Sequence, residues 1–218
     1  FEIDRINVAK SLGFKNVSYN SVDAVSDRDF IAEFIFCCST IMMHLSRMAE
    51  EFIIWCNPNF GYISLPQNLT SGSSIMPQKQ NPDYLELIRG KTAKVYSDLI
   101  GILVLMKALP LSYNRDMQED KVYMFSSYET TKQCIEVMCI VVKNIKLNYE
   151  RLREDVENYD FIFATELANF FVKHLGYPFK LAHKKTKEIL GYCRDKNKKL
   201  RQLSYEDYVK VLGTRFNK

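Results

Sequence analysis

The chain has 218 residues, of which 47% are hydrophobic and 26% are charged. These proportions are those of a globular protein and exclude a disordered or fibrous chain. The formal net charge of +4 is too small to indicate nucleic-acid binding by itself.

Uncharged apolar runs are short throughout the sequence. The longest lie near residues 99–106 and 137–142, whereas a membrane-spanning helix needs about 20 apolar residues. We therefore expect no membrane-spanning helix and a cytoplasmic protein. The first residue is Phe1 and charged residues follow it at once, so we expect no signal peptide and a sequence that starts partway into a longer protein.

Six cysteines occur, at positions 37, 38, 56, 134, 139 and 193, and no two form a CxxC pair. Most lie in apolar helical stretches, which predicts reduced thiols in the core of a cytosolic protein. Cysteine and histidine do not cluster at the spacing of metal ligands, so we expect no metal site and no cofactor.

Three long segments carry apolar residues at three- and four-residue steps, the period of a helix. They run over Asp29–Cys56, about Pro82–Ala108 and about Glu119–Arg151, with Asp27 or Ser26 expected to cap the first. Such long helices bury their apolar stripes against one another in an extended bundle. Because the stripes are broad, we expect further burial in an oligomer; a monomeric bundle is the alternative.

After Asp155 the pattern changes to shorter helical segments, at 163–174, 179–190 and 205–212. We predict an all-α fold with two domains: a partial central helical bundle over residues 1–155 and a small C-terminal helical domain over 156–218. No segment keeps the alternation typical of a strand.

The segment Asn57–Asn81 lacks helical periodicity and is long for a loop in a compact domain, which favours a functional role. Its second half contains Gly72 beside three serine hydroxyls, and also Lys79, and Pro82 suits the first turn of the next helix. The start of this helix leaves backbone N–H groups free beside Lys79 and Asn81. We therefore predict that an anion binds at this corner. An ordinary serine- and glycine-rich surface loop is the alternative.

Residues 72–82 read GSSIMPQKQNP, and this segment resembles the GSSxMPxKxNP signature of the fumarase/aspartase superfamily. Residues 21–30 (SVDAVSDRDF) and 109–121 (LPLSYNRDMQEDK) are similar to two regions of the argininosuccinate lyase family. Residues 164–169 (ATELAN), with Pro178-Phe179 and Ala182-His183, are similar to its small C-terminal domain. The resemblance covers nearly the whole chain and implies a C-terminal portion that lacks the N-terminal domain.

This resemblance implies an enzyme of arginine biosynthesis and the urea cycle that cleaves argininosuccinate to arginine and fumarate by β-elimination. A proton leaves the carbon beside a carboxylate, and the guanidinium nitrogen then departs. Hydrogen-bond donors and cations aimed at the doubly charged carbanion provide most of the catalysis. The family also implies a homotetramer with sites shared between subunits.

The resemblance assigns three catalytic roles in and after the loop. Ser73 is implied as the proton-transferring serine, Lys79 as the cation that stabilises its charge, and Glu86 as the partner of a catalytic histidine. Asn81 is implied to hydrogen-bond a substrate carboxylate. Two alternatives stay open: the histidine is the base and Ser73 the donor, and Glu86 is only a solvated carboxylate at a helix start.

Tyr113, Gln118 and Lys121 match substrate-contacting positions of the family. Tyrosine and glutamine can hydrogen-bond the arginine moiety, and lysine can hold a carboxylate. Asp27 and Arg28 are expected to line or brace the site; a helix cap and a surface ion pair are the alternative.

The sequence departs from the family pattern at Gln80, which stands where a second lysine is usual and removes one positive charge. His44, His174 and His183 do not sit in the Thr-His motif that carries the catalytic histidine of the family. The resemblance places that motif before the start of the sequence, so we expect the chain by itself to be inactive.

Three other functions remain alternatives: a non-catalytic, crystallin-like structural member of the same fold, another superfamily lyase such as adenylosuccinate lyase, and a nucleic-acid-binding helical module. The last rests on the lysine-rich stretch 173–201. Because Ser73, Lys79, Asn81 and Glu86 are all present, we favour the lyase and expect no nucleic-acid or membrane partner.

Overall fold

The computed structural model describes residues 2–72, 74–76 and 78–213. It divides into two compact units, Phe1–Leu147 and Asn148–Lys218, whereas the sequence predicts the domain boundary after Asp155. The helix α6 (Tyr149–Asn158) belongs to the second unit, where it packs against the 3₁₀ helix η3 (Asp160–Phe163).

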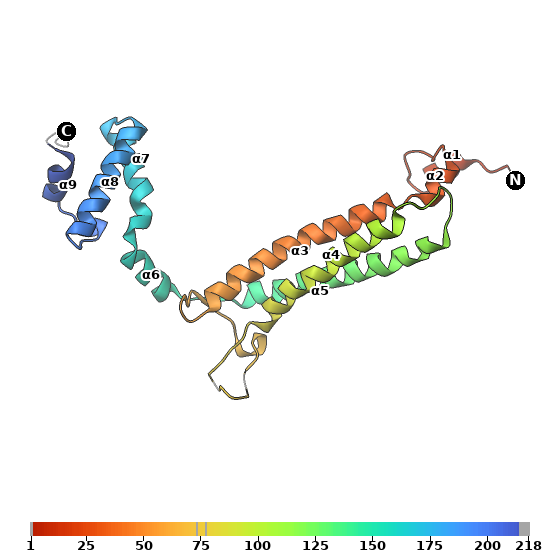
Figure 1. Ribbon diagram of the computed structural model, residues 1–218, viewed down its shortest axis with the longest axis horizontal. Coiled ribbons are helices and arrows are strands. Elements are labelled where there is room, and N and C mark those ends of the chain that lie inside the picture. The colour runs from red at the N-terminus through yellow and green to blue at the C-terminus, as the bar shows by residue number, and fades with distance from the viewer. Residues whose placement is uncertain (1, 73, 77, 214–218) are drawn as a thin grey trace. The chain divides into compact units, whose positions relative to one another are not determined.

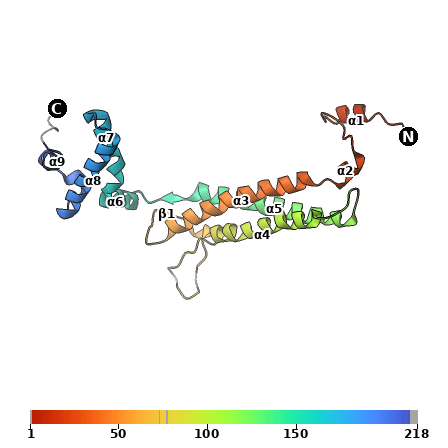
Figure 2. The ribbon, with the colours of Figure 1, turned by 45° about the horizontal axis from the view of Figure 1, so that its top comes forward.

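Three long helices lie side by side in the first unit: α3 (Asp29–Cys56), α4 (Asp83–Met106) and α5 (Asp120–Asn144), as Figures 1 and 2 show. The predicted all-α bundle is confirmed, and α3 has the predicted bounds. The prediction that the third helix reaches Arg151 is wrong, because Ile145 adopts an extended conformation (φ −60°, ψ 133°) that ends α5.

The core of this unit consists of apolar side chains from all three helices. Fully buried examples are Ile35, Met42, Leu85, Val95, Ile102 and Val141. Polar contacts also join the helices: the Asp98 carboxylate in α4 accepts hydrogen bonds from the hydroxyls of Ser126 (2.7 Å) and Ser127 (3.0 Å) in α5. A buried carboxylate is tolerated here because these two hydroxyls replace the hydrogen bonds that water would otherwise donate to it.

Two very short strands contradict the prediction that the chain has none. The strands β1 (Ile63–Ser64) and β2 (Lys146–Leu147) pair antiparallel, with Ile63 opposite Leu147. Two residues are too few to show a period-two pattern, and the pairing joins segments far apart in the sequence. No local sequence pattern therefore predicts the pairing of β1 with β2.

Two short helices precede the bundle. Asp4 caps α1 (Arg5–Ser11) by accepting the Asn7 N–H, and Asn20 caps α2 (Ser21–Ser26) by accepting two backbone N–H groups. Such caps satisfy N–H groups that a helix start leaves without an intrahelical acceptor.

The second unit has its own core, formed by α7 (Ala164–Leu175), α8 (Phe179–Asp195) and α9 (Tyr205–Leu212), with the 3₁₀ helix η4 (Leu200–Gln202). The three predicted short helices are confirmed, although α8 continues to Asp195. Gly176 ends α7 in the left-handed conformation at φ +66°, which glycine adopts without steric cost.

The six cysteines form no disulfide, and all of them lie in the described part of the chain. Cys38, Cys134 and Cys193 are buried, and burial raises the pKa of the Cys38 and Cys134 thiols. Cys37 and Cys139 are exposed, so the prediction of core thiols is wrong for these two, which face away from the core of this unit.

By length and composition, α3 is one helix that could cross a membrane. The core helix of a bundle can have the same length and apolar composition, and α3 packs against α4 and α5. Only 28% of its most apolar window is buried within the chain. Much of the apolar surface of α3 therefore has no cover within the described residues.

Candidate functional site

The loop between α3 and α4 is closed at its base by a two-stranded bridge. The Ser71 N–H donates to the Asn81 carbonyl (3.0 Å) and the Asn81 N–H to the Ser71 carbonyl (2.8 Å). Leu69, in the 3₁₀ helix η1 (Gln67–Leu69), is buried and anchors the segment before the bridge. The loop that carries the GSSIMPQKQNP motif is therefore held at both ends. Ser73, its predicted catalytic serine, lies outside the described residues.

Helix α4 begins directly after this bridge. Pro82 is its N-cap residue, and the Pro82 carbonyl accepts the N–H groups of Leu85 (2.9 Å) and Glu86 (3.2 Å). The N-cap residue makes no side-chain capping hydrogen bond, and its two neighbours in the chain are Asn81 and Asp83. The first turn instead carries two carboxylates, which the helix dipole favours at that end.

A cavity of about 490 Å³ lies where the end of α3, the loop and the start of α4 meet. Lys79, Asn81 and Glu86 all line it, together with apolar side chains that include Ile53 and Met76. The structure therefore brings three of the four predicted residues of the signature segment to one cavity. An ammonium, an amide and a carboxylate beside an apolar wall can bind a small anionic molecule and assist proton transfer to or from it.

A second group of predicted residues meets at the start of α5. The Arg28 Nε and the Lys121 Nζ donate to the two oxygens of the Asp120 carboxylate, at 2.6 Å and 2.8 Å. Burial alone would raise the pKa of Asp120, but the hydrogen bonds from Lys121 and Arg28 hold it below its usual range. Asp120 was not among the site residues predicted from the sequence. The only available signal was its position beside Lys121 at the end of the LPLSYNRDMQEDK segment.

Tyr113 and Gln118 also contact each other near this end of the bundle. The Gln118 Nε2 donates to the Tyr113 hydroxyl at 3.2 Å, and both side chains are exposed. The Asp27 carboxylate accepts the Asp29 N–H at 2.8 Å. Asp29 is the first residue of α3, so Asp27 accepts one N–H group of the helix start. The N-cap residue is nevertheless Arg28, without a side-chain cap hydrogen bond, so the prediction that Asp27 or Ser26 caps this helix is wrong.

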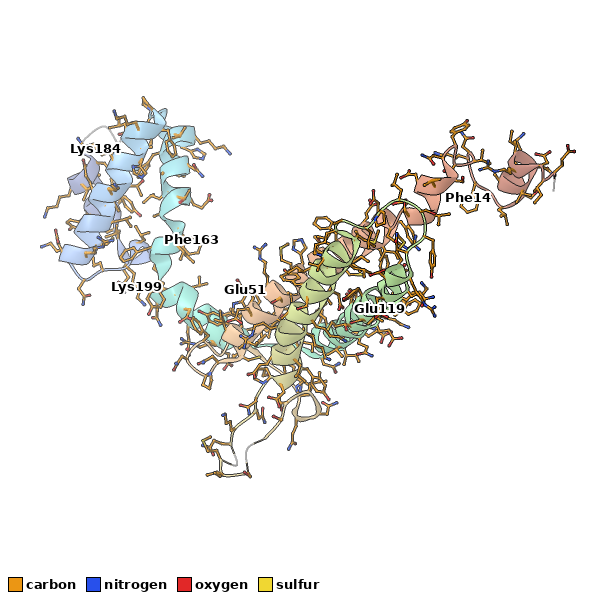
Figure 3. The ribbon with its side chains drawn as sticks, turned by 45° about the vertical axis from the view of Figure 1, so that its right-hand side comes forward. Phe14, Glu51, Glu119, Phe163, Lys184 and Lys199 are labelled. Atoms are coloured by element: carbon orange, nitrogen blue, oxygen red, sulfur yellow. The ribbon has the colours of Figure 1, made fainter. Side chains whose placement is uncertain are left out.

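The two groups of residues lie at opposite ends of α4, as Figure 1 shows. The first group (Lys79, Asn81 and Glu86) flanks the start of this helix, and the second, which includes Tyr113 and Lys121, follows its end. A helix of 24 residues is about 35 Å long. One copy of the chain therefore cannot place both groups on the same small molecule. The side chains at the two ends are drawn in Figure 3, where Glu119 marks the end that holds the second group.

None of the three histidines, all described, lines the cavity beside Lys79. The His174 ring packs on Phe170, with ring centroids 4.6 Å apart, and the His183 ring stacks on Phe179 at 6.3 Å. His44 lies in the middle of α3.

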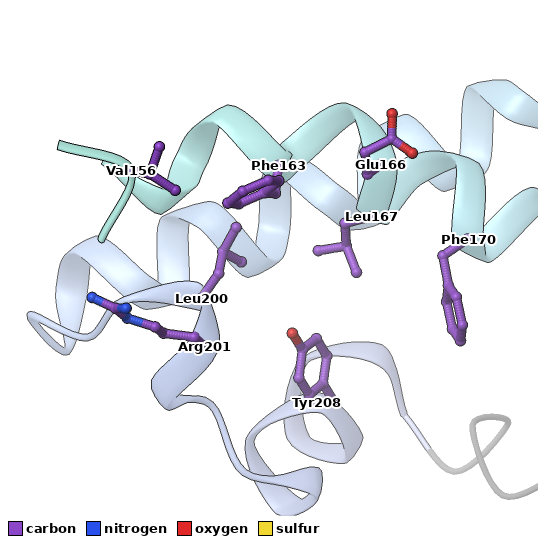
Figure 4. Close-up of a pocket in the computed structure, with 8 residues that line it drawn as sticks. All are labelled: Val156, Phe163, Glu166, Leu167, Phe170, Leu200, Arg201 and Tyr208. Carbon is purple, nitrogen blue, oxygen red and sulfur yellow. The ribbon is translucent and has the colours of Figure 1, made fainter. Parts of the chain in front are cut away.

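Another cavity, of about 420 Å³, lies in the second unit and is drawn in Figure 4. Its walls are mainly apolar and include Phe163, Leu167 and Phe170, with the Tyr208 ring on the facing side. None of the predicted site residues lines it. The charged side chain of Arg201 at its rim already pairs with Glu157.

Comparison with known proteins finds similar lyases. A family model described as a lyase matches residues 1–97, and one described as argininosuccinate lyase C-terminal matches residues 161–217. The argininosuccinate lyase of Caldicellulosiruptor bescii is 51% identical over 208 residues, 95% of this chain. That of Syntrophus aciditrophicus is 47% identical over 206 residues, 94% of this chain. Over nearly its whole length, the chain is similar to argininosuccinate lyases.

The chain spans under half the length of those relatives, 45% and 43% respectively. Solved structures show the same fold. EDDS lyase in complex with formate matches with a TM-score of 0.71 and 26% identity, over 92% of this chain and 39% of that one. A fumarate lyase:delta crystallin from Brucella melitensis matches with a TM-score of 0.71 and 21% identity, over 95% of this chain and 45% of that one.

Proposed function

We propose that the chain supplies the signature loop and the C-terminal part of an argininosuccinate lyase, which cleaves argininosuccinate to arginine and fumarate. The cavity that Lys79, Asn81 and Glu86 share carries this proposal. Identities of 47% and 51% to argininosuccinate lyases over nearly the whole chain support the choice of substrate.

In the proposed reaction a base removes a proton from the carbon beside a substrate carboxylate. The electron pair of that C–H bond forms the double bond of fumarate, and the C–N bond breaks toward the guanidinium nitrogen, which takes up a proton. Asn81 holds the carboxylate through its amide, and the Lys79 ammonium stabilises the negative charge that develops there. Ser73 transfers the proton, either as the base itself or as the donor beside a histidine base that Glu86 orients.

We further propose that the enzyme is a homotetramer whose sites combine residues of different copies. The separation of about 35 Å between the two groups of site residues supports this assembly. Large apolar side chains stand exposed along the bundle helices, which supports it too: Phe36 on α3, Ile100 and Leu103 on α4, and Phe125 on α5.

The metabolic role that we propose is arginine biosynthesis in the cytoplasm. The absence of disulfides among six described cysteines supports a reducing compartment.

A chimera tests the proposed activity. The part of the Caldicellulosiruptor bescii enzyme that lies outside the match is fused to this chain, and fumarate formation is followed by its ultraviolet absorbance. We expect turnover by the chimera and none by the chain alone. Lys79→Gln in the chimera should reduce kcat by about 10²–10³-fold, the usual effect of removing a group that stabilises developing charge.

Lys143→Gln is the matched control, because Lys143 is an exposed lysine in the last turn of α5. Equal rates for the two variants would contradict the role of Lys79. A chimera that folds and assembles but does not turn over argininosuccinate would contradict the lyase and favour the crystallin-like alternative.

A further inference from the structure

The carboxylate of Asp120 is buried at the start of α5 with both oxygens occupied. The side chain is 3% exposed, its Oδ2 accepts from Arg28 Nε and its Oδ1 accepts from Lys121 Nζ. Burial of a charge is costly unless opposite charges and hydrogen bonds compensate it, and here two cations do so.

The two cations differ in their surroundings. Arg28, 17% exposed, also donates through Nη1 to the carbonyls of Val25 (3.2 Å) and Asp27 (2.5 Å). Its guanidinium therefore joins the end of α2 to the start of α5. The Lys121 side chain is 61% exposed. Its ammonium thus rests on a fixed, buried carboxylate and faces outward.

An ammonium has three N–H donors, and Asp120 accepts from one of them. Asp120 is the acceptor for this ammonium among the described residues, so the other two N–H groups are left for a ligand, while the contact with Asp120 restricts the directions in which they point. A flexible lysine without such a support would lose more conformational entropy on binding.

We propose that Asp120 is a positioning residue, which holds the Lys121 ammonium so that its remaining donors receive a carboxylate of the substrate. This inference rests on the proposed lyase function, because Lys121 is assigned to substrate binding there. Asp120 itself does not touch the substrate. Its effect on binding passes through Lys121, and Arg28 fixes Asp120 in place.

The test is a double-mutant cycle in the chimera with Asp120→Asn and Lys121→Gln. Each variant should raise KM for argininosuccinate about tenfold and change kcat by less than about threefold. The double variant should be no worse than Lys121→Gln alone, because Asp120 acts through Lys121. Independent, multiplying effects on KM, or a loss in kcat alone, would overturn the proposal.

Asp98→Asn is the matched control, since Asp98 is also a buried carboxylate that accepts two hydrogen bonds, between α4 and α5. A purely structural role of Asp120 predicts that both variants lower the unfolding temperature and leave KM unchanged. If Asp120→Asn does not fold, Asp120→Glu serves instead, because it keeps the charge and displaces the carboxylate by one methylene.

A measurement on the chain itself does not depend on turnover. The exchange of the Arg28 Nε–H with solvent, followed by NMR, should become at least about tenfold faster in Asp120→Asn, since a neutral amide oxygen accepts a weaker hydrogen bond than a carboxylate. Unchanged exchange would overturn the positioning role even if the chimera is active. An inactive wild-type chimera, by contrast, would count against the lyase function.

Discussion

At Asp207 a single carboxylate joins three parts of the second unit. It accepts hydrogen bonds from the Tyr192 hydroxyl of α8 (2.7 Å), from Lys198 Nζ (2.8 Å) and from the Ser204 N–H at the cap of α9 (3.0 Å). The hydrogen bond from Lys198, followed by those from Tyr192 and Ser204, holds the pKa of Asp207 well below its ordinary value of 3.8. The charged form is therefore favoured in the folded state.

A lowered pKa gives stability that is present above the unfolded pKa and is lost as the pH falls through the folded pKa. We expect Asp207→Asn to be less stable than the wild type at neutral pH, and the two to converge below about pH 4. Amide hydrogen exchange in α8 and α9 measures this stability locally. Glu206→Gln, at a neighbouring exposed carboxylate, is the control, and a difference that stays constant down to low pH would contradict the prediction.

Residues of the site could be predicted from sequence only where a motif carries them. Lys79, Asn81 and Glu86 were found through the signature, and the structure brings them to one cavity. Asp120 was missed because an acidic residue at a helix start is common, and its partner Arg28 is 92 residues away. No local pattern reports such a contact.

At the scale of elements, periodicity predicts the long helices well, because their apolar stripes are the faces that become buried. It fails at the end of α5. Ile145 and Leu147 continue the helical spacing, but Ile145 is extended and Leu147 pairs with Ile63 in the short sheet. That pairing depends on a distant segment, so the sequence alone predicts too long a helix.

Two glycines of α4 give an internal comparison. A Cβ atom at Gly101 would overlap the ring of Tyr123 in α5, whereas a Cβ at Gly90 would meet nothing within 4 Å. We expect Gly90→Ala to stabilise the first unit by about 1 kcal/mol through helix propensity. Gly101→Ala should destabilise it by about 1–3 kcal/mol through overpacking.

Urea unfolding followed by the fluorescence of Trp55, the one tryptophan of the chain, measures both variants. A stabilising Gly101→Ala would show that α4 and α5 do not approach as closely as the structure has them.

At the scale of the whole molecule, the bundle exposes apolar side chains that the described part of the chain does not cover. Ile100 is 63% exposed and Leu103 is 56% exposed, both on α4. Burying such side chains between copies is favourable, by about 25 cal/mol for each Å² removed from water. The assembly that we propose would also bring together site residues that one copy holds apart.

We expect Ile100→Glu to dissociate the assembled chimera, because a carboxylate would then have to be buried without a partner. Sedimentation velocity measures the change in mass. Ile6→Glu, at an exposed apolar residue of α1, is the control and should leave the assembly intact. Equal masses for Ile100→Glu and the wild type would exclude this face from the interface.

The most direct test of the shared site mixes two impaired chimeras and measures their turnover at a substrate concentration well below the wild-type KM, where losses in kcat and in KM both lower the rate. One carries Lys79→Gln at the start of α4, and the other carries Lys121→Gln at the start of α5. If each site combines these two positions from different copies, unfolding and refolding the mixture produces some sites with both lysines intact, and the rate rises above the mean of the two components. A refolded mixture that assembles but keeps that mean rate would contradict the shared site.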